Sequence, residues 1–460
     1  MLRLPRCRPL PPFLLLVLLL CPNTLGDPQG ADVPVLHRLE VHRLQRQLDE
    51  LRGAVHELLT ESQLRCASDD AYWNPRLCER DRTIERRLHS DAFTAKEFHD
   101  MHEAKGRPVV IEAPRGAPYW SATGTDYGDL GWWKKHCGDG VAPVRVVPTN
   151  ISQAADFWSW PMVNMPLRHY IDFVLGDLSA RGAGFPDEML PLPPNRTYLF
   201  DWPISNCPSP TILDDLIIPR IFANDMLVLC RMYEAGSNST HQHCPYNNGD
   251  WPSLFIGIPG LKGSPLHRDN FGAAFFSIQL RGTKRWRVFA TVDSPLLYPS
   301  LSNDVQFSMH DTFAGTANSN FPLTKFAGKA DVLVGRGDLF YVPAGSPHQV
   351  EILDTGEEEG AVNVMLAFNY VSAANLERVI KTTAPQILEG TAFTFRTRLY
   401  KPLHDFFSLH KASLLRNVDW NIGHTRFRDF ASRTLPHVCM SHLAFSVDGE
   451  VTLAMVNTLM

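Results

Sequence analysis

The sequence lacks the features that mark several classes of protein. Beyond residue 26, no stretch reaches the roughly 18 consecutive apolar residues of a membrane-spanning helix, so no such helix is expected there. No run of five or more basic residues occurs and the formal net charge is −5, so nothing indicates a nucleic-acid surface. A Cys-x-x-Cys pair is missing, which leaves no indication of a zinc ribbon or redox motif. What is present is a chain of 460 residues, 44% hydrophobic and 20% charged, with ample material for a globular core.

The first 26 residues have the pattern of a secretory signal peptide. Arginines precede a short apolar run, Phe13–Leu20, and small residues near position 26 offer a cleavage site. This run is too short for a comfortable membrane span, although the longer segment Leu10–Cys21 leaves an uncleaved signal anchor as an alternative. We therefore expect a secretory-pathway protein without a stable membrane span after cleavage. The final residues, Val456–Met460, do not form a KDEL-like signal, so the endoplasmic reticulum lumen and secretion both stay open.

Two further features fit a lumenal or secreted protein. Asn-x-Ser/Thr acceptors for N-glycans occur at Asn150, Asn195 and Asn238. Beyond the leader lie seven cysteines, which in an oxidising compartment can form up to three disulfides and leave one over. Their connectivity cannot be deduced from the sequence, and buried free thiols are the alternative. The pairs that are close in sequence are Cys66 with Cys78 and Cys230 with Cys244.

The segment 27–66, after the leader, is expected to be helical. Apolar residues recur in steps of three and four from Val41 to Leu58, with charged and amide residues between them, in nearly three heptads. A pattern this short fits either a dimerising coiled coil, which would present Cys66 for an interchain bridge, or one amphipathic helix packed on the domain. A homodimer through residues 41–58 is therefore one expectation.

Two histidines and one carboxylate point to a metal site. His267 and Asp269 are two residues apart, so on a strand both side chains point to the same side while Arg268 turns away. His348 can complete the set from a neighbouring strand. Two imidazoles and a carboxylate on one face of Fe(II) leave its other positions open for cosubstrate and dioxygen. Because the chain holds 18 histidines, the interpretation depends on the sequence around these residues.

The surrounding sequence is rich in strand and turn signals. Residues 271–289 form two β-rich runs around a Gly-containing turn, which predicts a hairpin. In the second run Lys284 shares a face with apolar residues and points to the interior, where a lysine is costly unless an anion meets it. An edge position from which the ammonium reaches water is the alternative. Residues 337–350 predict a strand, a Pro/Gly turn and a second strand that begins near His348.

These motifs resemble the Jumonji-C class of Fe(II)- and 2-oxoglutarate-dependent oxygenases, and within it the small cupin-like hydroxylases. The motifs are Gly263–Asp269, Arg281–Trp286 and Pro343–His348, and shorter motifs in family order extend the resemblance over roughly residues 90–375. The resemblance implies a mainly β fold with flanking helices, built on a double-stranded β-helix, or jelly-roll cupin barrel. Its metal-bearing core is expected at about residues 250–372. Helical spacing in Leu376–Ile387 and Leu399–Leu415 predicts a helical C-terminal extension, 376–460, which serves relatives as a dimer contact or a cap.

The resemblance also implies roles in cosubstrate binding. Lys284 matches the family lysine that pairs with the distal carboxylate of 2-oxoglutarate, and Ser264 lies where a family hydroxyl bonds the same carboxylate. A positive charge and a hydroxyl together are what a desolvated carboxylate requires. Ser277 occupies the place of a polar cosubstrate contact in close relatives, or is simply a small residue that packs inward.

An asparagine on the strand after His348 is a further cosubstrate contact in the family. Asn369 fits the family's strand ending, an asparagine followed by an aromatic residue. Asn363 better fits the number of residues that separates this asparagine from the histidine in the family. Asn369 is favoured because residues 354–360, which are acidic and contain glycine, resemble a lengthened hairpin turn.

The implied reaction is the oxidation of a C–H bond, coupled to the conversion of 2-oxoglutarate and O2 to succinate and carbon dioxide. His267, Asp269 and His348 hold Fe(II) in this scheme, and the protein positions the reactants. We expect hydroxylation of a protein or peptide side chain; demethylation is the same reaction on an N-methyl group and stays open. The alternative is a catalytically silent cupin-fold scaffold, although a scaffold needs neither the three ligands nor Lys284.

Overall fold

The computed structural model describes the central part of the chain. The described residues are 82–90, 92–113, 120–148, 160–177, 185–189, 191–209, 211–222, 224–227, 252–261, 263–299, 307, 311–313, 321–354, 362–383, 404–412, 414–416, 418, 420–421 and 425–426. Several predictions lie outside these residues: the leader, the helical segment 27–66, the acceptors Asn150 and Asn238, and the cysteines Cys66, Cys78, Cys230, Cys244 and Cys439. The third acceptor, Asn195, is exposed.

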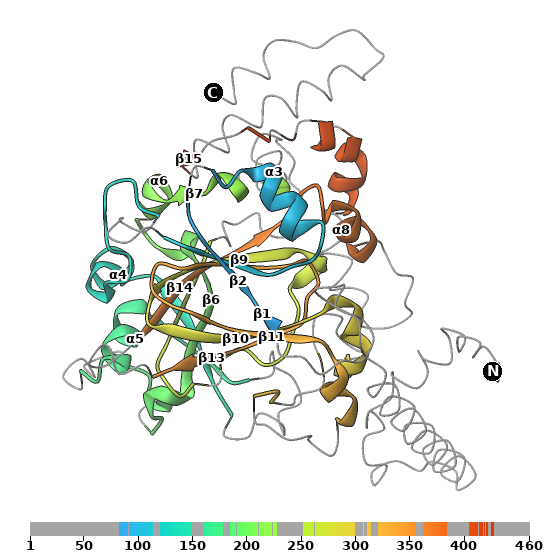
Figure 1. The fold of residues 1–460 in the computed structure, drawn as a ribbon. Helices are drawn as coiled ribbons and strands as arrows, with labels where there is room; N and C mark the ends of the chain where they lie inside the picture. The colour runs from blue at the N-terminus through green and yellow to red at the C-terminus, as the bar shows by residue number, and fades with distance from the viewer. Residues whose placement is uncertain are drawn as a thin grey trace, which may run out of the picture.

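Two β-sheets form the centre of the protein (Figure 1). In the order of the larger sheet the strands are β2 (Glu85–Leu88), β3 (Val109–Glu112), β12 (Leu339–Val342), β9 (Ala274–Arg281), β14 (Asn363–Tyr370), β8 (Ser253–Gly257), β6 (Thr197–Pro203), β4 (Val141–Val146) and β5 (Met162–Pro166). In the smaller sheet they are β1 (Arg82–Thr83), β11 (Lys329–Val334), β10 (Thr283–Phe289) and β13 (His348–Leu353).

The two sheets face each other as a jelly-roll barrel. Strands β8, β14, β9 and β12 are antiparallel neighbours in one wall, and β11, β10 and β13 form the other. The segment before β9 completes the second wall, because it pairs with β13 through Val350 N to Ser264 O and through reciprocal backbone bonds between His267 and His348. Two facing four-stranded walls are the arrangement of a double-stranded β-helix. The predicted fold class is therefore confirmed.

Burial along the strands explains how the sequence forms this barrel. In β10 buried and half-buried residues alternate, with Lys284, Trp286 and Val288 inside, as the predicted period of two requires. Arg285 and Arg287 point outward and pair with acidic side chains of the neighbouring strands β13 and β11. Strands β9 and β14 are instead buried along almost their whole length, because both of their faces are covered. One apolar cluster fills the barrel and a larger one lies on the outer face of the nine-stranded sheet.

Helices and short helical turns surround the barrel. The α-helices are α3 (Ala95–Phe98), α4 (Leu130–Cys137), α5 (Leu167–Val174), α6 (Ile212–Asp215) and α8 (Leu376–Thr383), and residues 404–412 and 414–416 are also helical. Helices α4 and α5 lie on one side of the barrel and α8 on the other (Figure 1). A two-stranded ladder joins β7 (Ile217–Ile218) to β15 (Thr425–Arg426). None of the described helices is both long and apolar enough to cross a membrane.

The shorter helical turns connect these elements. They comprise the π-helical turn η1 (His99–Glu103) and the 3-10 turns η5 (Asp187–Met189), η6 (Pro194–Arg196), η7 (Ile204–Asn206), η8 (Arg220–Phe222), η9 (Asn270–Gly272), η10 (Thr291–Leu297) and η11 (Pro322–Phe326). Most important for the site is η9, which begins directly after Asp269 and contains Phe271 in the left-handed region, with φ 47°. A non-glycine residue in that region is uncommon and marks a turn held in place by its surroundings.

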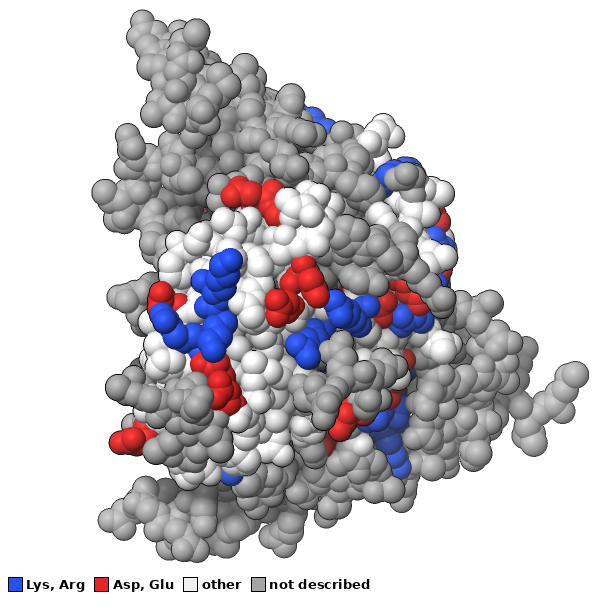
Figure 2. All heavy atoms as spheres, turned by 90° about the vertical axis from the view of Figure 1, so that its left-hand side faces the viewer, with Lys and Arg blue, Asp and Glu red and all other residues white. Residues whose placement is uncertain are grey.

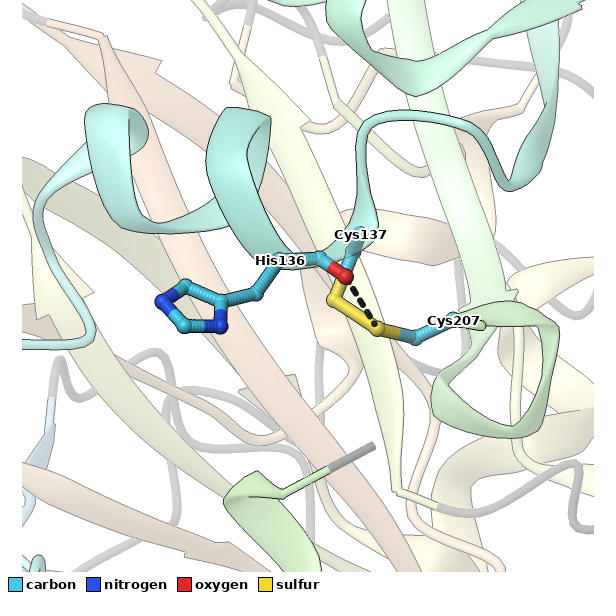
Figure 3. Close-up of a disulfide and its surroundings, with 3 residues drawn as sticks. All are labelled: His136, Cys137 and Cys207. Atoms are coloured by element: carbon cyan, nitrogen blue, oxygen red, sulfur yellow. Dashed lines mark hydrogen bonds between the residues drawn. A yellow bond between two sulfur atoms is a disulfide. The ribbon is translucent and has the colours of Figure 1, made fainter. Parts of the chain in front are cut away.

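A disulfide joins Cys137 at the end of α4 to Cys207 after η7 (Figure 3). The two cysteines are 70 residues apart in sequence, and both are buried. The Cys207 sulfur lies 3.5 Å from the His136 carbonyl oxygen; because an oxidised sulfur carries no proton, this is a close contact and not a donated hydrogen bond. The expectation of disulfides is thus met by a pair that the sequence spacing did not single out.

The C-terminal helices pack against the turn that follows Asp269. Phe271 is buried in a cluster with Leu376 and Val379 of α8 and with Phe406 and Phe407 of helix 404–412. Helix α8 approaches so closely that a Cβ atom at Gly272 would lie 3.1 Å from Arg378 Cγ. A Cβ atom at Gly345, in the turn before His348, would lie 3.1 Å from a guanidinium nitrogen of the same arginine. One helix therefore supports two turns that lead to the site.

The face that carries α4 and α5 has charges of both signs. Figure 2 shows basic and acidic side chains interleaved over the described part of this face. Ion pairs account for part of the mixture, including Lys134 of α4 with Asp172 of α5 and Arg168 with Asp139. The described part of this face therefore carries no field of a single sign.

Candidate metal and cosubstrate site

Three potential metal ligands meet at one end of the barrel. One ligand atom each from His267, Asp269 and His348 lies within 4.8 Å of the other two. The histidines are brought together by the backbone, because His267 N donates to His348 O at 3.0 Å and His348 N donates to His267 O at 2.7 Å. The sequence predicted this convergence from the two-residue spacing and from a neighbouring strand, and the pairing across the barrel shows how it arises.

Each histidine is fixed by a backbone carbonyl two residues earlier. Nδ1 of His267 lies 2.8 Å from Pro265 O, and Nδ1 of His348 lies 3.0 Å from Ser346 O. A carbonyl only accepts, so Nδ1 carries the proton and donates, which leaves the lone pair of Nε2 for a ligand. The same arrangement, with the second ring nitrogen bonded to a carbonyl, orients most metal-binding histidines.

The protonation states at neutral pH are those that a metal requires. Burial lowers the pKa of both histidines to about 4, and for His267 the neighbouring His348 lowers it further. Burial raises the pKa of Asp269 to about 6, an effect that His267 and a hydrogen bond from Asn369 oppose. At pH 7 the site therefore presents two neutral imidazoles and a largely ionised carboxylate, so little proton release is needed when a cation binds.

The three ligands line a pocket that enters the barrel. It encloses about 930 Å³ of empty space, part of which is open to solvent. The remaining lining residues are Tyr198, Phe200, Asp201, Ser253, Phe255, Ser264, Pro265, Leu266, Arg268, Asn270, Phe275, Lys284, Trp286, Val350, Met365, Ala367 and Asn369. Half of the twenty lining residues are apolar or aromatic and half are polar or charged, so the pocket combines apolar walls with converging polar groups, as small-molecule sites do.

Lys284 lies inside this pocket with no anionic partner among the residues that the structure describes. It is only 1% exposed, and its Nζ lies 3.3 Å from Tyr198 Oη and 3.3 Å from Met365 Sδ. Burial, with no compensating charge, lowers the pKa of Lys284 to about 7. The interior position predicted from the alternation of β10 is confirmed, and the alternative of an edge position is wrong. A buried amine without a counterion is matched by a carboxylate that enters the pocket.

The predicted hydroxyl groups lie at different depths. Ser264 lines the pocket and is 8% exposed. Ser277 is fully buried on β9 opposite Ala367, a lining residue, and its Oγ has no hydrogen-bond partner among the described residues. It is not itself a lining residue. Contact of either hydroxyl with a cosubstrate stays a prediction.

The two asparagines of β14 are clearly separated. Asn369 lines the pocket and donates to Asp269, so it orients a metal ligand. Asn363 is 1% exposed at the other end of the strand, close to Gly282, and is not a lining residue. The structure therefore brings Asn369 to the site and leaves Asn363 outside it; contact of Asn369 with the cosubstrate stays a prediction.

Several lining residues of β6 and β8 were not identified from the sequence. Tyr198 touches Lys284, and Phe200 packs edge-on against Phe255 with ring centres 5.0 Å apart. No role in the pocket was predicted from the sequence for any single residue of β6. The aromatic run Tyr198–Trp202 was the one signal in the sequence that could have indicated a lining strand. Its pairing with β8, which lies some fifty residues later in the sequence, depends on the tertiary fold.

Comparisons with known proteins place this site in a recognised domain. Residues 231–375 match the cupin-like domain family. HSPB1-associated protein 1 of Rattus norvegicus is 31% identical over 115 residues, which cover 24% of this chain and 23% of that protein. The Homo sapiens protein of the same name is 30% identical over 115 residues, 24% of this chain and 22% of its own. Arginine-specific demethylase JMJ20 of Arabidopsis thaliana is 25% identical over 187 residues, 40% of this chain and 37% of that protein. The chain thus spans about a quarter to a little over a third of these relatives.

Proposed function

Since residues 231–375 form a domain of the Jumonji-C, cupin-like family, we propose that this chain is an Fe(II)- and 2-oxoglutarate-dependent dioxygenase of the secretory pathway that hydroxylates a protein side chain. One observation carries the proposal. The pocket contains two histidines and an aspartate whose ligand atoms lie within 4.8 Å, together with a buried lysine that pairs with no described carboxylate. A metal-binding set and an unmatched positive charge in one cavity suit a metal and an anionic cosubstrate.

The donor set fits iron. His267 and His348 present Nε2 because their Nδ1 protons are held by backbone carbonyls, and Asp269 presents an oxygen whose orientation Asn369 fixes. Three ligands on one face leave the other positions open, which is the set typical of non-haem Fe(II) oxygenases. Bound iron and 2-oxoglutarate supply the oxidising power, and succinate and carbon dioxide are the coproducts.

The protein's own contribution is to bind and orient the reactants. Lys284 pairs with the distal carboxylate of 2-oxoglutarate, with Ser264 as a hydroxyl donor at the pocket wall and Tyr198 beside the ammonium. A charge-assisted bond in a buried site is stronger than a neutral one, so this pairing fixes the length and direction of the cosubstrate. The apolar walls keep water away from the centre, which limits side reactions.

The cellular part of the proposal is supported by three features. The first 26 residues have the sequence pattern of a secretory leader, the acceptor Asn195 is exposed, and the buried Cys137–Cys207 disulfide is of a kind that persists in oxidising compartments. The endoplasmic reticulum lumen and the extracellular space both satisfy these conditions. A homodimer through residues 41–58 or through the C-terminal helices belongs to the same proposal, and light scattering of the purified chain checks it.

Uncoupled turnover tests the enzyme proposal. Purified full-length chain with Fe(II), 2-oxoglutarate and O2 should release succinate without added substrate. Asp269→Ala should abolish both iron retention and succinate formation, while Asp187→Asn, an exposed carboxylate outside the pocket, should leave both unchanged. No succinate from the wild type, or equal succinate from Asp269→Ala, would show that the chain is instead a silent cupin-fold scaffold.

Mass spectrometry of secretory-pathway proteins tests the reaction type. Cells with and without the chain are compared for a mass gain of one oxygen atom on lumenal peptides. Because the plant relative is named as an arginine-specific demethylase, demethylation is the competing outcome, and it would appear as loss of a methyl group with release of formaldehyde. If lumenal proteins are unchanged and a metabolite disappears, the protein-substrate part of the proposal is wrong.

A further inference from the structure

Met365 brings a sulfur atom to the buried lysine of the pocket. It lies on β14, where it shares the inner face with Ala367 and Asn369, and all three residues line the pocket. Its Sδ lies 3.3 Å from Nζ of Lys284 and accepts a hydrogen bond from it. A thioether is a weak acceptor, so this contact compensates little of the cost of the buried charge. The sulfur therefore lies beside the ammonium that an incoming carboxylate would meet.

Access from the pocket distinguishes Met365 from the other buried methionines that the structure describes. Met165, Met189 and Met226 are each at most 2% exposed, belong to apolar clusters and are not lining residues. Met365 is 3% exposed, but it lines a cavity that is partly open to solvent. Hydrogen peroxide, a molecule little larger than water, can thus reach this sulfur without unfolding of the protein.

Oxidation changes what the sulfur offers to Lys284. Hydrogen peroxide transfers one oxygen atom to a thioether: the sulfur loses two electrons, an S–O bond forms as the O–O bond breaks, and water leaves. The product, a sulfoxide, is polar, whereas the thioether is apolar. Its oxygen accepts hydrogen bonds much better than the sulfur did. Next to an ammonium without an anionic partner among the described residues, that oxygen is held by a charge-assisted bond.

We propose that Met365 is a modification site, and that oxidation of its sulfur closes the pocket to the cosubstrate. The inference rests on the proposed function, because it concerns the pairing of Lys284 with the distal carboxylate of 2-oxoglutarate. The sulfoxide oxygen takes the donor that this carboxylate needs. Aromatic rings surround the ammonium, with Nζ 5.8 Å from the ring centre of Tyr198 and 5.5 Å from that of Phe255, so it has little freedom to turn to a second acceptor.

Site-resolved oxidation tests the first step. Full-length chain loaded with Zn(II), which has no redox chemistry, is treated with hydrogen peroxide, and sulfoxides are located by tandem mass spectrometry. Two methionines of β5 serve as internal controls: Met162 is 50% exposed, and Met165 is about as buried as Met365 but lies outside the pocket lining. Met162 and Met365 should be oxidised and Met165 should not, and saturating 2-oxoglutarate should protect Met365 alone. The proposal is overturned if Met365 stays reduced when Met162 is fully oxidised.

The affinity for 2-oxoglutarate tests the second step. In calorimetric titrations, peroxide treatment of the wild type should weaken 2-oxoglutarate binding by about tenfold or more, which corresponds to the loss of one charge-assisted hydrogen bond. Met365→Leu, which cannot form a sulfoxide, should bind equally well before and after treatment. Met365→Gln, whose amide oxygen imitates the sulfoxide, should bind weakly without treatment. Unchanged affinity of the oxidised wild type, or equal losses in the wild type and Met365→Leu, would refute the closure of the pocket.

Urea unfolding of the metal-free protein separates this proposal from the proposed function, because it needs no cosubstrate. A good acceptor beside the ammonium favours the charged form of Lys284. The stability of Met365→Gln should therefore rise less between pH 7 and pH 10.5 than that of Met365→Leu. Equal pH slopes of the two variants would contradict the pairing of residue 365 with Lys284. An untreated wild type that binds no 2-oxoglutarate would instead refute the proposed function.

Discussion

Replacing Lys284 by Met should stabilise the metal-free protein and at the same time abolish its affinity for 2-oxoglutarate. Burial lowers the pKa of Lys284 from 10.5 to about 7. Each pKa unit corresponds to about 1.36 kcal/mol, so the charged ammonium reduces the free energy of unfolding by an amount on the order of 5 kcal/mol. Methionine has a similar length and no charge, and it fits a wall that already contains a thioether.

The direction of the pH dependence follows from the two protonation equilibria. Between pH 7 and pH 10.5 the unfolded chain holds a proton on this lysine that the folded protein has lost, so the stability of the wild type rises with pH across that window. Below pH 7 both states are protonated and the full cost is present. The advantage of Lys284→Met should therefore be largest at pH 6 and should fade toward pH 10.

Urea unfolding in EDTA, from pH 6 to pH 10, measures both the free energy of unfolding and its dependence on pH. The control is Lys381→Met, at an exposed position, which should change neither of them. Calorimetric titration of the Mn(II)-loaded wild type at pH 8 should show uptake of roughly one proton per 2-oxoglutarate, because the carboxylate restores the ammonium form. If Lys284→Met is less stable than the wild type at pH 6, or keeps the wild-type pH slope, the assignment of Lys284 as an uncompensated buried amine is refuted.

Three further predictions concern the ligands, the disulfide and the turns. Mn(II) affinity should fall about tenfold per pH unit below pH 6, where Asp269 takes up a proton, and calorimetric titrations that give equal affinity at pH 7 and pH 5 would contradict this. Changing Cys137 and Cys207 together to Ala should lower the free energy of unfolding by roughly 4 kcal/mol, because the bond closes a 70-residue separation; urea unfolding of the reduced wild type should show a similar loss. Gly272→Ala and Gly106→Ala should each lower the free energy of unfolding by about 1 kcal/mol, because both glycines have left-handed backbone. Only Gly272→Ala, whose Cβ would meet α8, should also weaken Mn(II) binding. Equal Mn(II) affinities of the two variants would refute the argument from this contact.

The sequence predicted those parts of the site that depend on local periodicity. A period of two put His267 with Asp269, and it put Lys284 on the inner face of β10, as the burial of that strand confirms. Ordered motifs then predicted the barrel itself. Each of these inferences needs only the geometry of one strand or the order of several motifs along the sequence.

Other features depend on contacts that periodicity cannot show. Asn363 and Asn369 fall on the same face of a regular strand, so only their depth in the barrel separates them. Cys137 and Cys207 meet because α4 and η7 are packed together, which no spacing reveals. Asp201 faces the pocket because of a bulge, and an inserted residue reverses the alternation on which such a prediction is based.

Helix α8 contacts the site although it lies outside the part of the chain that matches the family. The match to the cupin-like family ends at residue 375, one residue before α8 begins. Arg378 of that helix nevertheless lies against Gly272 and Gly345, in the turns that follow Asp269 and precede His348. A change in the position of this helix would therefore be expected to reach both turns at once, and through them Asp269 and His348. The matched residues, 231–375, are thus not the whole of the part that packs around the site.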